Sequence, residues 1–301
     1  MADLQNIYNL VKCGADSVLG TGTKGCKQSL KKASSIWLTP KGFKFDGSET
    51  LDEDYIQSLQ VEGSLIVLKG LRTFTDNSSE DIIESLEDGT KQVATLGLYE
   101  FAVQFINGLA FHAALHSLNS YGSYDVIFVD RDGNLFGTTA IDGSFKGFSV
   151  GMLQANKLAW ASDSTGQKEG IMFQLTDRAE LDINYIYIQQ SQLSGFYPQN
   201  QDGINEVVLK FDAIPADAGT EIVVSAKSKS NMNAWIGADE IDFKITNDGT
   251  VLTKTVSELN GVYSFTVEEL ASNNKVIVSL DGIIDKDGSL YKADKIEAIV
   301  I

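Results

Sequence analysis

Residues 124–140 read YDVIFVDRDGNLFGTTA, and this stretch gives the clearest indication of the fold. An apolar, β-branched run is followed by Asp132-Gly133 and then by a second run that ends in threonines. Asp-Gly readily adopts the positive φ angles of a tight hairpin turn. The stretch therefore predicts a strand, a turn and a second strand. Residues 171–190, IMFQLTDRAELDINYIYIQQ, favour the same strand–turn–strand pattern.

Similar signals extend toward the N-terminus. Residues 35–48, SIWLTPKGFKFDGS, predict another strand–turn–strand unit, and residues 64–71, SLIVLKGL, predict a buried strand. Residues 51–63 place apolar side chains on one face of a short amphipathic helix. Residues 98–118, LYEFAVQFINGLAFHAALHSL, fit either a strand followed by a helix or a mostly helical segment, since Gly108 is awkward in both.

Three segments lack a buried pattern. Residues 1–30 are punctuated by glycine and predict an N-terminal arm or an extended loop. Residues 75–90 are acidic and loop-like, and residues 88–97, DGTKQVATLG, favour a turn that leads into a strand. Residues 194–203, SGFYPQNQDG, combine Gly, Pro, Asn and Gln with few apolar side chains, which indicates a linker between two domains.

Beyond this point short Val- and Ile-rich runs such as EVVLKFDAI, EIVVSAKS and KVIVSLDGI alternate with turn residues. Roughly seven short strands over about 100 residues are typical of an immunoglobulin-like sandwich, although the Cys–Trp–Cys core of antibody domains is missing. The predicted fold class is therefore mainly β. Residues 1–195 should form a β-sandwich or barrel with one or two helices, and residues 200–301 a C-terminal immunoglobulin-like β-sandwich.

The composition restricts the possible functions. The chain has 301 residues, a formal net charge of −17 and 43% hydrophobic residues, enough for a sizeable core. Binding DNA by neutralising phosphates needs clustered Lys and Arg, which such an acidic protein does not favour. No apolar run reaches the roughly 18 residues of a membrane span, and no apolar core of signal-peptide length follows Met1. Cys13 and Cys26 would remain thiols in a reducing cytoplasm or form a disulfide outside the cell, and two ligands alone cannot make a structural zinc site.

The only two histidines, His112 and His116, stand four residues apart in GLAFHAALHSLN. This is the spacing of a zinc pair on a helix, but the protease motif also needs a glutamate directly after the first histidine and a third ligand. Ala113 occupies the glutamate position, and no third histidine exists. We therefore interpret the pair as ordinary side chains on a helical face rather than as metal ligands.

Other candidate motifs also have simpler structural explanations. Two acidic turns suggest calcium loops, but their glycines stand at the fourth position instead of the sixth, which favours hairpin turns. Their candidate ligands are Asp130, Asp132 and Asn134 in one turn and Asp285, Asp287 and Ser289 in the other. Tyr185 and Tyr187 could stack on sugars or bases, but this spacing is typical of one face of a strand. We predict no catalytic, cofactor-binding or metal-binding residues, no cofactor and no enzymatic activity.

Three stretches carry a resemblance to a known class of protein: FTDNSSED (74–81), LYEFAVQFINGLAFHAALHSLN (98–119) and YDVIFVDRDGNLFGT (124–138). In their order and length they resemble virion structural proteins of tailed bacteriophages, of the type found in phages of Bacteroidetes. The resemblance covers roughly residues 1–190. With an assembling domain followed by an immunoglobulin-like domain, the plan is similar to that of major tail tube proteins.

The resemblance implies a protein that assembles with itself into stacked, hexameric rings, contacts other virion proteins and lets DNA pass without specific binding. It would be made in the host cytoplasm and reside in the phage tail. The C-terminal domain would project outward and contact host-surface glycans weakly. Two alternatives stay open: a capsid or head-decoration protein on the head surface, and a protein that binds or hydrolyses carbohydrate.

Overall fold

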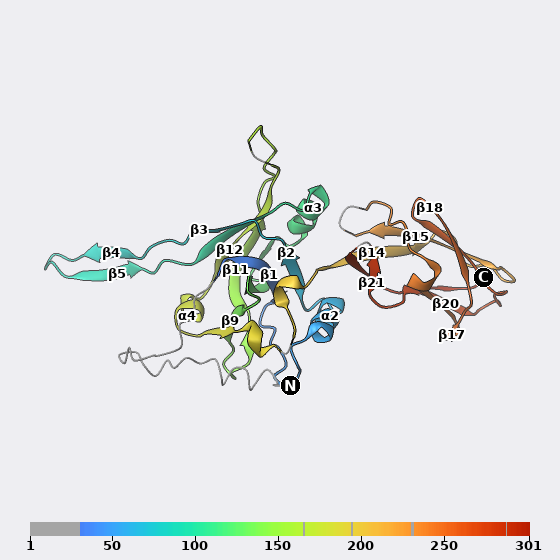
Figure 1. Cartoon of the computed structure of the whole chain (residues 1–301), viewed down its shortest axis with the longest axis horizontal. Helices are drawn as coiled ribbons and strands as arrows, with labels where there is room; N and C mark the ends of the chain where they lie inside the picture. Colours follow the sequence, from blue (N-terminus) through green and yellow to red (C-terminus); the bar gives the residue numbers. More distant parts are fainter. Residues whose placement is uncertain (1–30, 165, 194, 230–231, 287) are drawn as a thin grey trace. The chain divides into compact units, whose positions relative to one another are not determined.

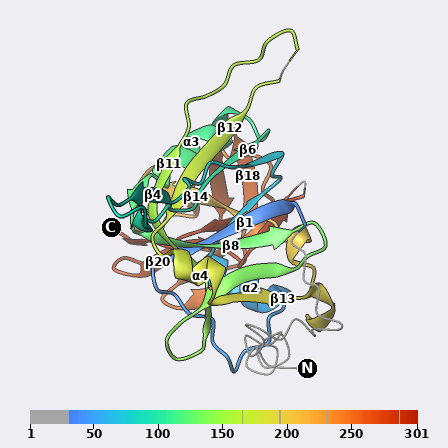
Figure 2. The ribbon, with the colours of Figure 1, turned by 90° about the vertical axis from the view of Figure 1, so that its left-hand side faces the viewer.

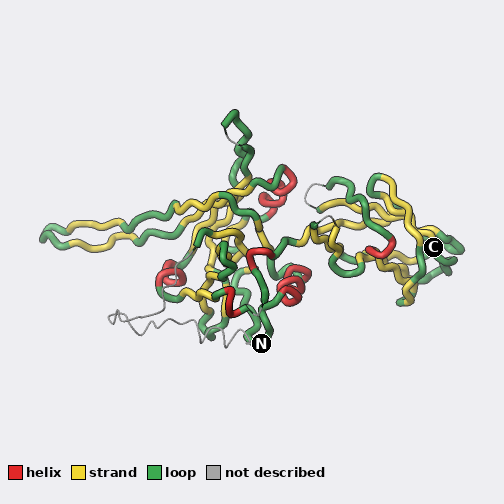
Figure 3. The backbone as a smooth tube through the Cα atoms, viewed as in Figure 1, coloured by secondary structure: helices red, strands yellow, loops and turns green. Residues whose placement is uncertain are grey.

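The computed structural model describes residues 31–164, 166–193, 195–229, 232–286 and 288–301. The chain divides into two compact units, Met1–Gly203 and Ile204–Ile301 (Figure 1). Strands dominate both units, and the helices are short (Figure 3). The prediction of a mainly β protein is confirmed.

Most strands of the first unit belong to one large curled sheet with the order β10-β9-β8-β11-β12-β6-β3. β1 adds to β8 and β2, β13 pairs with β9, and β7 pairs with β11. The strands are β1 (Ala33–Pro40), β2 (Ile66–Lys69), β3 (Thr73–Asp76), β4 (Ile82–Ser85), β5 (Lys91–Thr95), β6 (Glu100–Phe105), β7 (Ser120–Tyr121), β8 (Tyr124–Asp130), β9 (Leu135–Thr139), β10 (Phe145–Lys146), β11 (Phe148–Ala155), β12 (Glu169–Leu175) and β13 (Tyr185–Ile188). The helical segments are α2 (Glu53–Val61), α3 (Leu109–Ser117), α4 (Arg178–Asp182), and the 3-10 turns η2 (Gln190–Gln192) and η3 (Pro198–Asn200).

The hairpin predicted for residues 124–140 is confirmed. β8 and β9 pair antiparallel with Phe128 opposite Phe136, and Gly133 takes a φ of 84° in the turn between them. The strand-then-helix alternative holds for residues 98–118, where Gly108 (φ 91°) separates β6 from α3. The prediction for residues 171–190 is wrong in one respect. Helix α4 connects β12 to β13, and the two strands do not pair with each other. β12 pairs with β11 and β6, whereas β13 pairs with β9.

The sheet is buried on both faces around β1 and β8, which explains why the two strands are apolar almost throughout. Ile36 and Leu38 of β1 belong to one hydrophobic cluster, whereas Trp37 between them belongs to a second. Helix α2 covers the second cluster with Ile56 and Leu59. In Figure 2, β1 and β8 run across the view while β11 and β12 rise steeply, as the curl of the sheet requires.

Residues 77–98, here called the projecting hairpin, leave the sheet between β3 and β6. β4 and β5 form a separate two-stranded sheet in which Ser85 pairs with Lys91. Figure 1 shows the hairpin extending away from the rest of its unit. The strand expected within residues 88–97 is confirmed as β5, but its partner β4 lies in the stretch interpreted as an acidic loop. The loop prediction is wrong for Ile82–Ser85.

The second unit is a sandwich of two sheets around a single cluster of buried residues that includes Trp235, Phe243 and Tyr263. One sheet has the order β18-β19-β15-β14-β22-β21, and the other has the order β17-β16-β20-β23. The elements are β14 (Ile204–Phe211), β15 (Glu221–Ser228), η4 (Glu240–Asp242), β16 (Phe243–Asn247), β17 (Thr250–Val251), β18 (Thr255–Leu259), β19 (Val262–Thr266), β20 (Lys275–Leu280), β21 (Ile284–Lys286), β22 (Ser289–Ala293) and β23 (Ile296–Ile299).

The segment interpreted as a linker packs instead onto the first unit. Phe196 is buried in the cluster around Trp37, and Pro198 and Gln201 are also buried. Lys69 donates a hydrogen bond to the Asn200 carbonyl at 2.9 Å. A single aromatic side chain is enough to dock a stretch of otherwise polar composition, so the first unit ends at Gly203.

Candidate functional site

The projecting hairpin exposes an unusual amount of apolar surface. Every residue of β4 and β5 is exposed. Ile83 of β4 lies opposite Val93 of β5, and the register shifts between Ile82 and Ile83, so that Ile82 lies opposite Thr95. A two-stranded hairpin is only marginally stable in isolation. The large exposed apolar residues of the hairpin are Ile82, Ile83, Leu86, Val93 and Leu96.

Polar contacts fix the root of this hairpin. The Gly97 N–H donates to Asp81 Oδ1 at 2.8 Å, and Arg178 of α4 forms ion pairs with Asp81 and with Asp182. The Gly97 N–H is the main reason that the pKa of Asp81 lies below its ordinary value, and Arg178 lowers it further. A Cβ atom on Gly97 would lie 1.9 Å from the Ser79 carbonyl oxygen, so this close approach of the two strands requires glycine. The hairpin therefore leaves the sheet in a defined direction.

The tip of the hairpin is a tight acidic turn. The Leu86 N–H donates to the Thr90 carbonyl at 2.8 Å, and Gly89 takes a φ of 81°. Asp88 accepts hydrogen bonds from the backbone and the hydroxyl of Thr90. Glu84 and Glu87 are exposed and form no ion pair with any other described residue. The hairpin thus presents acidic and apolar side chains together.

A cavity of about 390 Å³ opens beside the root of the hairpin, and we call it the aromatic groove. Six aromatic rings line it, and Phe74 packs on Phe101 at 5.2 Å and edge-on to Phe128 at 5.7 Å between ring centroids. The volume falls within the range of roughly 300–1,000 Å³ that is typical of binding pockets. The groove is lined by Lys31, Lys32, Ala33, Phe74, Asp76, Tyr99, Phe101, Phe128, Asp130, Asn134, Phe136, Leu181 and Tyr187.

The polar groups inside the groove are engaged by the protein itself. Asp130 is buried, and its Oδ1 accepts from the N–H groups of Asp132 and Asn134 at 2.9 Å each. Its Oδ2 accepts from the Asn134 amide at 2.8 Å and from the Tyr187 hydroxyl at 3.3 Å. Burial, followed by the nearby charge of Asp130, raises the pKa of Tyr187 to about 12. The polar groups of Asp130, Asn134 and Tyr187 are therefore engaged in internal hydrogen bonds, and aromatic rings form much of the remaining lining.

Basic residues lie at and beside the mouth of the groove, although the chain is strongly acidic. Two of them line the groove, and the backbones of two more contact Lys32. Lys31 and Lys32 line the groove, the Lys32 ammonium donates to the Arg72 carbonyl at 2.5 Å, and the Arg131 N–H donates to the Lys32 carbonyl at 3.1 Å. All four are exposed, and none forms an ion pair within the described ranges. We call Lys31, Lys32, Arg72 and Arg131 the basic rim.

The histidines lie side by side on α3, with 3.2 Å between the Nε2 atoms of His112 and His116. The part of the chain that the structure describes contains no group of three or more His, Cys, Asp or Glu side chains that could hold a metal ion. Cys13 and Cys26, and the predicted N-terminal arm at residues 1–30, lie outside the described residues.

The acidic turns and the tyrosines lie within β-hairpins and strands. The Asp130 carboxylate accepts hydrogen bonds from Asp132 and Asn134 of its own turn. At the second turn β21 pairs with β22, and Lys286 lies opposite Ser289. Tyr185 and Tyr187 share the face of β13 that packs on Phe136, Tyr187 being buried and Tyr185 exposed.

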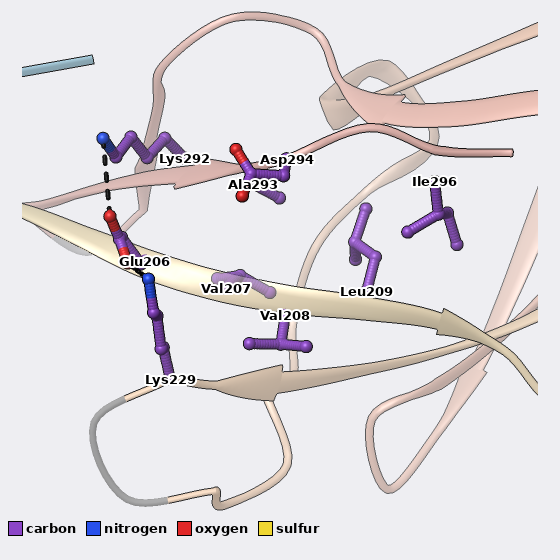
Figure 4. A pocket seen from close by; sticks show the side chains of 9 residues that line it. All are labelled: Glu206, Val207, Val208, Leu209, Lys229, Lys292, Ala293, Asp294 and Ile296. Carbon is purple, nitrogen blue, oxygen red and sulfur yellow. Dashed lines mark ion pairs between the residues drawn. The ribbon is translucent and has the colours of Figure 1, made fainter. Parts of the chain in front are cut away.

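The second unit has a smaller cavity of about 110 Å³ where the parallel pairing of β14 with β22 ends at Val207 and Ala293. Glu206 lies between two lysines there and forms ion pairs with Lys229 and, at 3.5 Å, with Lys292 (Figure 4). Burial opposes ionisation of Glu206, but the two lysines hold its pKa below the ordinary value. No aromatic ring is among the described residues that line this cavity, so it offers no stacking surface for a sugar.

Sequence reasoning missed the aromatic groove and the basic rim. The rim and the aromatic rings come from positions between Lys31 and Tyr187, and only the pairing of distant strands brings them together. The alternation of aromatic residues in YEFAVQF was a usable signal for one of the contributing strands.

Comparison with protein-family models gives no match, and no curated protein sequence matches the chain. No helix in the described ranges is long and apolar enough to cross a membrane.

Proposed function

We propose that this chain is a non-enzymatic virion structural protein of a tailed bacteriophage, the major tail tube protein, whose first unit assembles into stacked rings that conduct DNA. The observation that carries this proposal is the projecting hairpin. It holds the apolar side chains of Ile82, Ile83 and Val93 exposed to solvent, and the Arg178–Asp81 ion pair supports its root.

The energetics favour a buried hairpin in the working state. Large contiguous apolar surfaces exposed by a soluble protein usually mark interaction sites. Full burial of an isoleucine or valine side chain contributes about 1.5–3 kcal/mol. Ile82, Ile83 and Val93 therefore hold a substantial free energy of association that the single chain leaves unused. An open two-stranded hairpin with unpaired edges also provides backbone groups for pairing with another chain.

The charge of the chain is compatible with this role. A tube that conducts DNA should not retain it, and a formal net charge of −17 opposes contacts with phosphates. The Asp130 carboxylate at the aromatic groove is engaged in internal hydrogen bonds, and this supports binding rather than catalysis as the use of the site.

In this proposal the second unit is an immunoglobulin-like appendage. Its two sheets, in which most strands pair antiparallel, enclose a core around Trp235 and Phe243, and this sandwich supports that role. The appendage would project outward from the particle, where weak contact with host glycans would occur at its surface rather than in the cavity at Glu206.

Electron microscopy of the purified full chain at high concentration tests the proposal. We expect rings or tubes, formed reversibly as protein and salt concentrations change. A uniformly monomeric species under all salt conditions would contradict self-assembly. Antibody labelling of intact particles then separates the roles, because labelled tails support the tube protein and labelled heads would make the chain a capsid or decoration protein.

A further inference from the structure

From the aromatic groove and the basic rim, we infer that the groove is the receptor for the projecting hairpin of a second copy of the chain. This inference rests on the proposed self-assembly and adds its contact surfaces. The hairpin supplies exposed aliphatic side chains near its tip, Leu86 among them, and the groove supplies six aromatic rings in an open cavity of about 390 Å³.

The two surfaces are complementary in charge. The projecting hairpin, residues 77–98, contains five acidic residues and one basic residue, Lys91. Lys31 and Lys32 of the basic rim line the groove, Arg72 and Arg131 contact Lys32 through their backbones, and none of the four forms an ion pair with another described residue. Complementary charge at the edge of an apolar contact fixes orientation and speeds encounter. Among the described residues the acidic tip and the basic rim thus each lack ionic partners that the other could provide.

The hairpin cannot fill the groove of its own chain. Phe74, Asp76 and Tyr99 line the groove and stand at the two strand ends from which the hairpin departs. The hairpin extends away from this point (Figure 1), so its tip lies remote from the cavity at its root. The occupant must therefore come from another molecule. A contact between a hairpin and a different surface on the next copy is head-to-tail, and such contacts generate closed rings or open helical filaments.

Charge reversal on each surface tests the inference. One variant carries Glu84→Lys and Glu87→Lys on the hairpin, and another carries Lys31→Glu and Arg131→Glu on the rim. These side chains are exposed and form no ion pair with described residues, so the fold should be retained. We expect each variant to associate about tenfold more weakly than the wild-type chain.

The chain that carries both reversals should regain association to within about threefold of wild type, because only directly contacting groups compensate each other. Glu268→Lys with Glu269→Lys is the matched control, since it makes the same change of charge at exposed positions of the second unit and should leave association unchanged. A double-reversal chain as weak as the two effects combined, or a rim reversal without effect, would overturn the inference.

A photoreactive amino acid at Leu86 supplies a second measurement. We expect it to cross-link to the Phe74 or Phe101 region of another copy in the wild-type background. Cross-links to residues 1–30, to the second unit or to a different protein would overturn the groove as receptor. If the wild-type chain assembles but cross-links only at these other places, the proposed function stands and the inference about the groove fails. If the wild-type chain never associates, the proposed function and the inference both fail.

Discussion

Replacing Ile82 and Ile83 by serine should weaken self-association strongly and leave the folded unit intact. Full burial of an isoleucine contributes about 1.5–3 kcal/mol. Both residues are 61% exposed in the single chain, so roughly 1–2 kcal/mol remains available from each on assembly. Loss of about 2–4 kcal/mol lowers the association constant roughly 30- to 700-fold. Because exposed positions rarely affect stability by more than about 0.5 kcal/mol, thermal unfolding should hardly change.

Sedimentation velocity over a concentration series measures this effect, with thermal unfolding recorded on the same samples. Ile241→Ser with Leu259→Ser is the matched control, because these residues are 79% and 74% exposed but belong to the second unit. The reasoning is refuted if the Ile82/Ile83 variant associates like the wild-type chain. It is equally refuted if the control variant loses association to the same extent.

Three further predictions concern the fold that supports the hairpin. Burial raises the pKa of Asp125 above its ordinary value of 3.8, so ionisation of this carboxyl destabilises the folded state. The free energy of unfolding should therefore fall as the pH rises from about 3.8 through the raised pKa. Asp125→Asn should therefore flatten the pH dependence of the free energy of unfolding in this range and increase stability at neutral pH, as measured by urea unfolding. Phe173→Ala should reduce the free energy of unfolding by about 3–5 kcal/mol, because the side chain is fully buried, and an unchanged urea midpoint would contradict the core assignment. Gly97→Ala should displace the Ser79 carbonyl and increase hydrogen exchange across residues 77–98, with little change in the thermal midpoint of the unit.

Local signals identified the elements whose conformation depends on neighbouring residues. The β8–β9 hairpin was predictable because Asp132-Gly133 encodes the turn and the flanking runs match strands. The strand at Lys91–Thr95 was predictable for the same reason, since Asp88 and Gly89 form the turn before it. The sandwich of the second unit followed from its regular alternation of short strands and turns.

The remaining features depend on contacts that no local pattern contains. The sequence of β4 resembled a loop because all of its residues are exposed and no alternation of buried and exposed positions marks a strand. Its strand conformation comes from pairing with β5. Residues 194–203 looked like a linker, yet Phe196 docks into the cluster around Trp37. The aromatic groove required the fold itself, since strands distant in sequence supply Phe74 and Tyr187.

A cryo-electron microscopy reconstruction of the assembly formed by the purified full chain is the most direct test of repeated contact between copies. We expect density in which residues 77–98 of each copy are buried against a neighbour, with the acidic tip beside Lys31 and Arg131. Assemblies in which these residues face open solvent, or grids that contain only single molecules at every concentration, would contradict the account.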